Sequence, residues 1–171
     1  MADVPAIARV HVQSWRTTYR GLLPDDLLAG LSTERREEQW RRSLEGSATD
    51  AASGCVYVLE REGDVVGFAN GGPEREAGSV FDGELHAIYL LEEHQGHGYG
   101  RALFTRVAAF LSEHGCTSMR VWVLAGNPAE AFYRRMGGAR VAEKLIEIGG
   151  VAYSEVAYGW RELRPPAVGR A

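Results

Sequence analysis

Residues 84–111 read ELHAIYLLEEHQGHGYGRALFTRVAAFL, and this stretch decides how the rest of the chain is arranged. It begins with an apolar run of strand length and ends in a segment whose apolar residues recur at the spacing of one helix face. The residues on that face are Leu103, Val107, Phe110 and Leu111. Between the two segments stand three glycines at alternate positions, Gly96, Gly98 and Gly100. The stretch therefore predicts a strand, a glycine-rich loop and a helix.

The glycine-rich loop lies where the helix is expected to begin. Glycine lets the backbone turn sharply and removes side chains that would keep a ligand away, so backbone amides can converge on one anion. A pyrophosphate cradle is one interpretation, and a tight turn without a ligand is the other. Spacing excludes two common phosphate motifs. A dinucleotide fingerprint would need a small residue where Arg101 or Leu103 stands, and a P-loop would need Gly-Lys-Ser/Thr.

The pattern Gln95-x-x-Gly98-x-Gly100 after an apolar strand resembles the acyl-CoA signature of the GCN5-related N-acetyltransferase (GNAT) superfamily. The resemblance implies that the loop amides hold the pyrophosphate of acetyl-CoA. It also implies that the preceding strand pairs through its backbone with the pantetheine arm. The loop residues are Gln95, Gly96, His97, Gly98, Tyr99, Gly100 and Arg101, and the strand residues are Ile88, Tyr89 and Leu90.

A second segment, Asn127 to Gly138, is similar to the superfamily's Asn-x-x-x-x-x-Tyr-x-x-x-Gly-Phe pattern. The resemblance implies that Asn127 hydrogen-bonds the cofactor and that Tyr133 protonates the departing thiolate. Gly138 replaces the usual phenylalanine, a departure that we expect to affect packing more than chemistry. Two motifs at the right separation are specific where either alone would be weak.

The order of the predicted elements matches the superfamily over almost the whole chain. Hydrophobic periodicity predicts helices at 4–20, 22–30, 32–44, 101–111 and 129–136, strands at 85–91 and 117–124, and hairpins at 55–70 and 139–160. The strands on either side of the central helix form a βαβ unit and must be parallel. The expected fold is therefore α/β (α+β) and GNAT-like, a mixed central sheet flanked by helices. We expect one domain at 1–164 and a tail at 165–171.

Composition limits the function classes. A net charge of −4 over 171 residues argues against a nucleic-acid partner, which would require a basic face. No apolar run approaches the ~20 residues needed to span a membrane, and the first residues lack a signal-peptide pattern, so we expect a cytoplasmic protein. Cys55 and Cys116 are expected to be free, buried thiols. Neither they nor the five histidines show zinc-ligand spacing, so no metal is predicted.

Acetyl transfer to an amine needs a neutral amine, an oxyanion donor and a proton for the thiolate. A phenol has a pKa near ~10, so Tyr133 can keep its proton at neutral pH and donate it as charge develops on sulfur. Its alternative role is to pack its helix against the sheet. The oxyanion donor would be the backbone amide of Ile88 or Leu90.

An alkylammonium has a pKa near ~10.4, so a base must remove its proton, directly or through water. Glu84 precedes Gly98 by the spacing at which histone-acetylating relatives place their glutamate base. By strand alternation His86 shares a face with Glu84 and is the second choice. The alternative is that both are exposed residues at the end of a strand.

The acceptor amine is left open by the sequence. Trp15 and Tyr19 lie one turn apart on the first helix and either pack in the core or, as the resemblance implies, border the acceptor pocket. Small amines, amino-acid derivatives, antibiotics and protein N-termini are all acceptors of similar folds. The rival interpretations are a non-catalytic acyl-CoA-binding or sensor domain and a nucleotide-binding protein. Homodimers are common in the superfamily, and no pattern here decides the oligomeric state.

Overall fold

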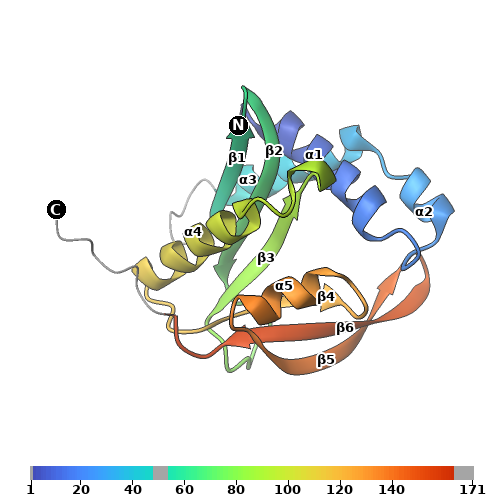
Figure 1. Cartoon of the computed structure of the whole chain (residues 1–171). Helices are drawn as coiled ribbons and strands as arrows, with labels where there is room; N and C mark the ends of the chain where they lie inside the picture. The colour runs from blue at the N-terminus through green and yellow to red at the C-terminus, as the bar shows by residue number, and fades with distance from the viewer. Residues whose placement is uncertain (1, 48–53, 164–171) are drawn as a thin grey trace.

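The computed structural model describes residues 2–47 and 54–163 and contains one six-stranded sheet in the order β1-β2-β3-β4-β6-β5 (Figure 1). The helices are α1 (Val4–Thr18), α2 (Asp25–Ala29), α3 (Thr33–Ser47), α4 (Tyr99–Glu113) and α5 (Ala129–Arg135), with a 3-10 turn, η2, at Glu92–His94. The strands are β1 (Cys55–Arg61), β2 (Asp64–Pro73), β3 (Gly83–Leu90), β4 (Met119–Leu124), β5 (Ala139–Ile148) and β6 (Val151–Trp160). The expected mixed sheet flanked by helices is confirmed.

Helices cover both faces of the sheet. Figure 1 shows α4 crossing β1–β3 on one side, with α1 and α3 behind the same strands and α5 in front of β4 and β6. The helix face predicted from periodicity is buried, with Val107 fully enclosed and Leu103 and Leu111 nearly so. On the opposite face, α1 and α3 pack on β2 through residues such as Val10, Trp40 and Phe68. Each amphipathic helix therefore buries its apolar stripe against one side of the sheet.

One histidine lies inside this second core. His11 is 8% exposed and stands between Tyr89 and Phe68, with ring centroids 4.9 and 5.5 Å away. The indole N–H of Trp40 donates a hydrogen bond of 3.2 Å to His11 Nδ1. Burial, and then the nearby positive charge of Arg36, lower the pKa of His11 to about 3. The imidazole is therefore neutral in the folded protein at physiological pH.

The two central strands touch at one end only. β3 and β4 are parallel, as expected for a βαβ unit, and pair at Gly83 with Met119 and at Glu84 with Arg120. Beyond these positions the described residues form no further β3–β4 pairs, so the strands diverge toward the carboxyl end of β3. All other neighbouring strands are antiparallel. The divergence opens the sheet beside the glycine-rich loop.

Several expectations are refined by the structure. The helix after Asn127 begins at Ala129, with Pro128 in the cap position, yet Asn127 Oδ1 accepts a 2.8 Å hydrogen bond from the Ala129 amide. Cys55 and Cys116 are free as expected, but each is only partly buried. The tail expected at 165–171 lies outside the described residues. Within the described ranges no helix has the length and apolar character needed to cross a bilayer.

Candidate active site

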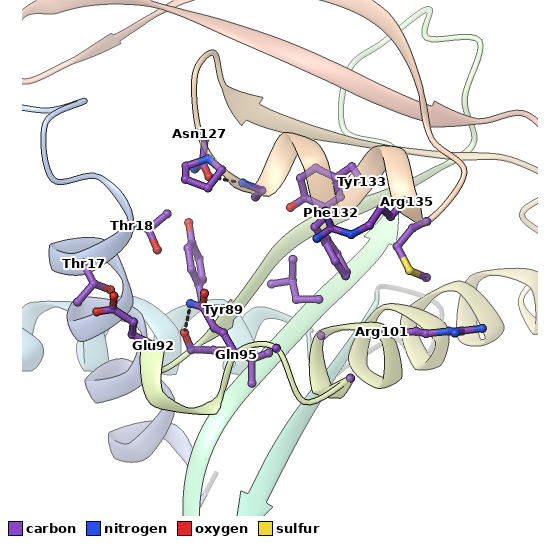
Figure 2. Close-up of a pocket in the computed structure, with 18 residues that line it drawn as sticks. Thr17, Thr18, Tyr89, Glu92, Gln95, Arg101, Asn127, Phe132, Tyr133 and Arg135 are labelled. Carbon is purple, nitrogen blue, oxygen red and sulfur yellow. Dashed lines mark hydrogen bonds between the residues drawn. The ribbon is translucent and has the colours of Figure 1, made fainter.

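A pocket of about 880 Å³ lies where β3 and β4 diverge. Its walls come from the end of α1, the last residues of β3, the glycine-rich loop, and the segment 127–136 that carries α5 (Figure 2). Most of the residues proposed from the two motifs line it together. These are Ile88, Tyr89, Leu90, Gln95, Gly96, Gly98, Gly100, Arg101, Asn127 and Tyr133.

The glycine-rich loop has the geometry of an open cradle. Gly96 and Gly98 adopt left-handed φ values of 79° and 84°, and a Cβ at either position would meet nothing within 4 Å. Gly98 is the N-cap of α4, and no side chain within residues 2–47 and 54–163 caps that helix. The first amides of α4 therefore lack a side-chain partner and carry the positive end of a 15-residue helix. An anion of ligand size fits this arrangement.

The side chains of the glycine-rich loop contact the end of β3 and one another. Gln95 donates through Nε2 to the Leu90 carbonyl at 3.1 Å and so ties the loop to the end of β3 (Figure 2). His97 and Tyr99 do not line the pocket, and their rings stack on each other at 5.9 Å. Only the backbone of these two residues is available for the cradle role expected from the motif.

Tyr133 is positioned by α5 with its hydroxyl pointing into the pocket (Figure 2). The side chain is 4% exposed and packs in the main core, so it has the packing role considered from the sequence, and its hydroxyl also faces the pocket. Its hydroxyl makes no hydrogen bond with any residue in the described ranges. Burial, and then the proximity of Tyr89, raise the pKa of Tyr133 above its usual value. The phenol therefore keeps its proton at neutral pH and has a free donor.

The aromatic residues of α1 form a cluster around Tyr89. Trp15 Nε1 donates to the Tyr89 hydroxyl at 3.0 Å, and the hydroxyls of Tyr19 and Tyr89 are 3.3 Å apart. Tyr19 is buried, whereas Trp15 is half-buried, with the Arg36 guanidinium 5.6 Å above its ring. Neither Trp15 nor Tyr19 lines the pocket directly, but both hold Tyr89, which does.

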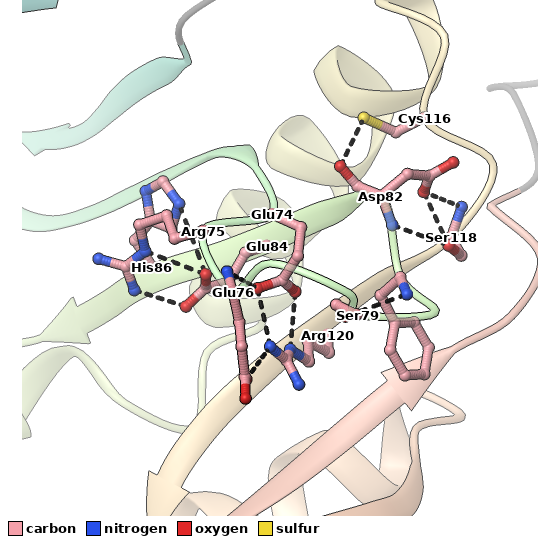
Figure 3. Close-up of polar contacts among 11 residues, drawn as sticks. Glu74, Arg75, Glu76, Ser79, Asp82, Glu84, His86, Cys116, Ser118 and Arg120 are labelled. Carbon is pink, nitrogen blue, oxygen red and sulfur yellow. Dashed lines mark hydrogen bonds and ion pairs between the residues drawn. The ribbon is translucent and has the colours of Figure 1, made fainter.

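Glu84 and His86 lie beside each other but outside the pocket (Figure 3). Glu84 is 3% exposed and forms a two-point ion pair with Arg75, whose Nε donates at 3.0 Å. His86 Nε2 stands 4.0 Å from Glu84 and is buried without a hydrogen-bond partner in the described part of the chain. Burial, and then the Arg75 charge, lower the pKa of His86. The proposed strand-end exposure of Glu84 is therefore wrong, because Arg75 covers it.

The closed end of the diverging strands is held by further polar contacts (Figure 3). Arg120 donates to Glu74 at 2.7 and 2.8 Å and also pairs with Glu76. Asp82 accepts from the amides of Thr117 and Ser118 at 2.9 and 2.8 Å. These contacts join the segment before β3 to the start of β4. Within the described residues no group of three or more His, Cys, Asp or Glu side chains is arranged to hold a metal ion.

Some residues of the site were not foreseen from the sequence. Thr17, Thr18 and Glu92 line the pocket on one side, and Phe132 and Arg135 line it from α5. Phe132 and Arg135 are three residues apart and so share a helix face, a spacing that could have identified them. Arg101 and Arg135 give the pocket two cationic side chains beside the glycine-rich loop.

Comparison with known proteins identifies the family. The model of the Acetyltransferase (GNAT) family matches residues 13–138. The uncharacterised N-acetyltransferase YuaI of Bacillus subtilis strain 168 is 47% identical over 165 residues, which cover 95% of this chain and 90% of that protein. The chain belongs to the GNAT family. This GNAT protein is thus an N-acetyltransferase, and the resemblance inferred from the two motifs is confirmed.

Solved structures share the GNAT fold along nearly the whole chain. A ribosomal-protein-alanine N-acetyltransferase from Brucella melitensis has a TM-score of 0.70 at 27% identity, covering 93% of this chain and 94% of that chain. YncA from Salmonella typhimurium, solved with its cofactor acetyl-CoA, has a TM-score of 0.66 at 22% identity, covering 99% of this chain and 94% of that one. The second likeness shows the fold alone.

Proposed function

We propose that this enzyme transfers an acetyl group from acetyl-CoA to a primary amine by direct attack, with both substrates bound at once. One observation carries the proposal: the free hydroxyl of Tyr133 shares a pocket with the glycine-rich loop. The loop offers unpaired helix-terminal amides for phosphate, and Tyr133 offers a proton for a thiolate. The catalytic domain is proposed to occupy residues 1–164.

The residues present fit acetyl-CoA as a substrate. The backbone of Gln95–Arg101 would receive the pyrophosphate, because Gly96 and Gly98 leave open space where other residues would place a Cβ. The diverging edge of β3 at Ile88, Tyr89 and Leu90 would pair with the pantetheine arm, and Asn127 would bind it from the other side. The presence of acetyl-CoA in the YncA structure supports this assignment.

Two of the three chemical demands have a candidate group in the pocket region of this chain. Tyr133 would donate its proton to the departing sulfur, and the backbone amide of Ile88 or Leu90 would stabilise the oxyanion. The amine must lose a proton to a base or to water. Glu84 and His86 were the candidates from sequence, but Arg75 holds the Glu84 carboxylate and Nε2 of His86 is buried. Because the Arg75 guanidinium occupies both oxygens of the Glu84 carboxylate, Glu84 is better suited to shaping this region than to accepting the proton of the amine.

Ligand-induced stabilisation tests the cofactor assignment. Thermal unfolding is measured with acetyl-CoA, CoA, ATP and NAD at matched concentrations. A ligand at ~100 times its Kd adds about 2.7 kcal/mol to the free energy of unfolding, and we expect this for acetyl-CoA and CoA alone. Stabilisation by ATP or NAD instead would favour a nucleotide-binding protein.

Turnover then separates an enzyme from a sensor domain. Thiol release from acetyl-CoA is followed with a panel of small amines, amino-acid derivatives, aminoglycosides and peptide N-termini. We expect Tyr133→Phe to lose ~10²–10⁴-fold in kcat while CoA still stabilises the protein. Tyr57→Phe, a substitution of the same kind on β1, is the matched control and should react normally. Equal rates in the two variants would contradict the role given to Tyr133.

A further inference from the structure

Glu155 occupies a special position on β6. Its Cα pairs with Leu124 of β4 on one side and with Lys144 of β5 on the other. Val156 and Tyr158, which lie one and three residues further along β6, belong to the core that contains Tyr133. Strand alternation therefore directs Glu155 to the opposite face of the sheet.

That face is where the aromatic cluster of α1 meets the sheet. Leu124, the cross-strand neighbour of Glu155, packs in one cluster with Tyr19, and Tyr89 and Tyr153 pack against the same cluster. Leu124 also immediately precedes the turn that brings Asn127 into the pocket. Glu155 thus lies on the face of the sheet opposite α5. It is not among the residues that line the pocket, but its cross-strand neighbour Leu124 shares a cluster with Tyr89, which does line it.

The Glu155 carboxylate is half-buried but unpaired. It makes no hydrogen bond or ion pair with any residue in the described ranges. Its cross-strand neighbour Lys144 places its ammonium 3.9 Å over the ring of Trp122. Two glutamates on the opposite face, by contrast, accept hydrogen bonds: Ser154 donates to Glu143 at 2.6 Å, and Tyr158 donates to Glu130 at 2.8 Å.

The charged groups that act on Glu155 come from β5, from β3 and from the segment before β3. Lys144 of β5 and Arg75 before β3 favour the ionised carboxylate, whereas Glu84 of β3 opposes it. Besides burial, the negative charge of Glu155 contributes to the raised pKa values of Tyr19 on α1 and Tyr89 on β3. Burial dominates these influences and raises the pKa of Glu155 above its ordinary value. A carboxylate with a raised pKa is a stronger proton acceptor.

We propose that Glu155 is the general base that deprotonates the acceptor amine. This inference rests on the proposed function and assigns a residue to its open step. Glu155 takes one proton from the substrate ammonium, which frees the nitrogen lone pair to form the C–N bond as the thioester C–S bond breaks. Tyr133 gives its proton to the departing sulfur. The second proton lost by the nitrogen restores the Tyr133 hydroxyl, directly or through water, so that atoms and charges balance.

A pair of probe amines tests the role of Glu155 in turnover. Propylamine is an ammonium ion at pH 7 and needs a base, whereas hydroxylamine is already neutral at that pH and does not. We expect Glu155→Gln to lower kcat/KM for propylamine ~10²–10⁴-fold. Hydroxylamine should react within about threefold of the wild-type rate, and raising the pH to 9 should restore part of the propylamine rate. Glu147→Gln, the same exchange at an exposed position on β5, is the control.

Failure of the proposed acetyl-CoA site and failure of the role of Glu155 give different results. Stabilisation of Glu155→Gln by acetyl-CoA should equal that of the wild type, so a loss of that response would point to the cofactor site rather than to the base. Equal losses with propylamine and hydroxylamine would overturn the proposal. So would a propylamine rate in Glu155→Gln within threefold of the wild-type rate, since the proton would then have another acceptor.

A second readout does not depend on turnover. Carbon-13 NMR of protein labelled at the glutamate carboxyl carbons follows each ionisation with pH, and the Glu155 signal is the one absent from Glu155→Gln. We expect its titration midpoint to lie above that of a glutamate in an unstructured peptide. A midpoint equal to or below the peptide value would overturn the proposal, because the Glu155 carboxylate would then be no stronger a base than a solvent-exposed glutamate.

Discussion

The buried imidazole of His11 should make the enzyme sensitive to mild acid. Its Nδ1 accepts the Trp40 N–H, so a proton at Nδ1 would break that hydrogen bond and place a charge in the aromatic core. The pKa of His11 is therefore lowered from 6.5 to about 3 in the folded state. The unfolded chain takes up this proton below pH 6.5, and the folded protein does not. The contribution of neutral His11 to the free energy of unfolding is therefore fully present above pH 6.5 and is lost as the pH drops toward 3.

The size of the effect follows from the pKa difference. One pKa unit corresponds to about 1.4 kcal/mol, so His11 alone should remove about 2 kcal/mol of unfolding free energy between pH 7 and pH 5. The full difference would approach about 5 kcal/mol near pH 3. Domains are stable by only about 5–15 kcal/mol, so the loss at pH 5 should be readily measurable.

Urea unfolding at pH 7 and pH 5 measures this contribution. His11→Asn keeps an acceptor for Trp40 near the position of Nδ1 but cannot be protonated in this range. Between pH 7 and pH 5 the free energy of unfolding of the wild type should fall by about 2 kcal/mol more than that of His11→Asn. All other titrating groups are present in both proteins, so the difference reports His11 alone. His97→Asn, at an exposed position, controls for the exchange itself. Identical losses in the wild type and His11→Asn would refute the reasoning.

Three further substitutions test the packing and the cradle. A Cβ at Gly138 would meet Trp160 at 2.7 Å. Gly138→Ala should therefore lower the free energy of unfolding, measured with urea, by about 1–3 kcal/mol. The loss should be smaller when Trp160 is also replaced by phenylalanine. Gly98→Ala should destabilise the protein by about 1 kcal/mol and weaken stabilisation by acetyl-CoA, because φ is 84° there. Gly115→Ala, where φ is 89° just beyond the other end of α4, should destabilise the protein similarly without weakening that stabilisation. Arg120→Met should cost about 3 kcal/mol, because the buried Glu74 carboxylate loses both hydrogen bonds from Arg120 and keeps the 2.9 Å hydrogen bond from the Glu76 amide. A loss below about 1 kcal/mol in chemical unfolding would contradict this.

The sequence predicted those parts of the site that depend on local pattern. The strand, the glycine-rich loop and the helix follow one another along 84–111, so their joint geometry is encoded in neighbouring residues. Tyr133 lines the pocket as the resemblance to the Asn-x-x-x-x-x-Tyr pattern implies, because it lies on the short helix α5 that follows Asn127. The structure also explains why glycine stands at position 138 in place of the family's usual phenylalanine. The ring of Trp160 occupies the space that a side chain at 138 would need.

Features that depend on distant partners could not be predicted in this way. Arg75 covers Glu84 from a segment between two strands, and no periodic pattern marks a residue that reaches back across a turn. The bulge between Asn70 and Gly71 shifts the pairing of β2 with β3 and changes what surrounds His86. Glu155 was overlooked because its environment exists only once β6 inserts between β4 and β5. The closing hairpin was expected, but its order in the sheet was not.

The cradle at the start of α4 is made of main-chain amides, with glycine needed only where φ is positive. A surface of this kind keeps its ligand while most side chains around it change. The face proposed to receive the acceptor amine carries the side chains of Trp15, Tyr89 and Glu155, and each substitution there alters its shape or charge. Variation among descendants of one ancestral enzyme can therefore redirect the choice of amine while the acetyl donor stays the same.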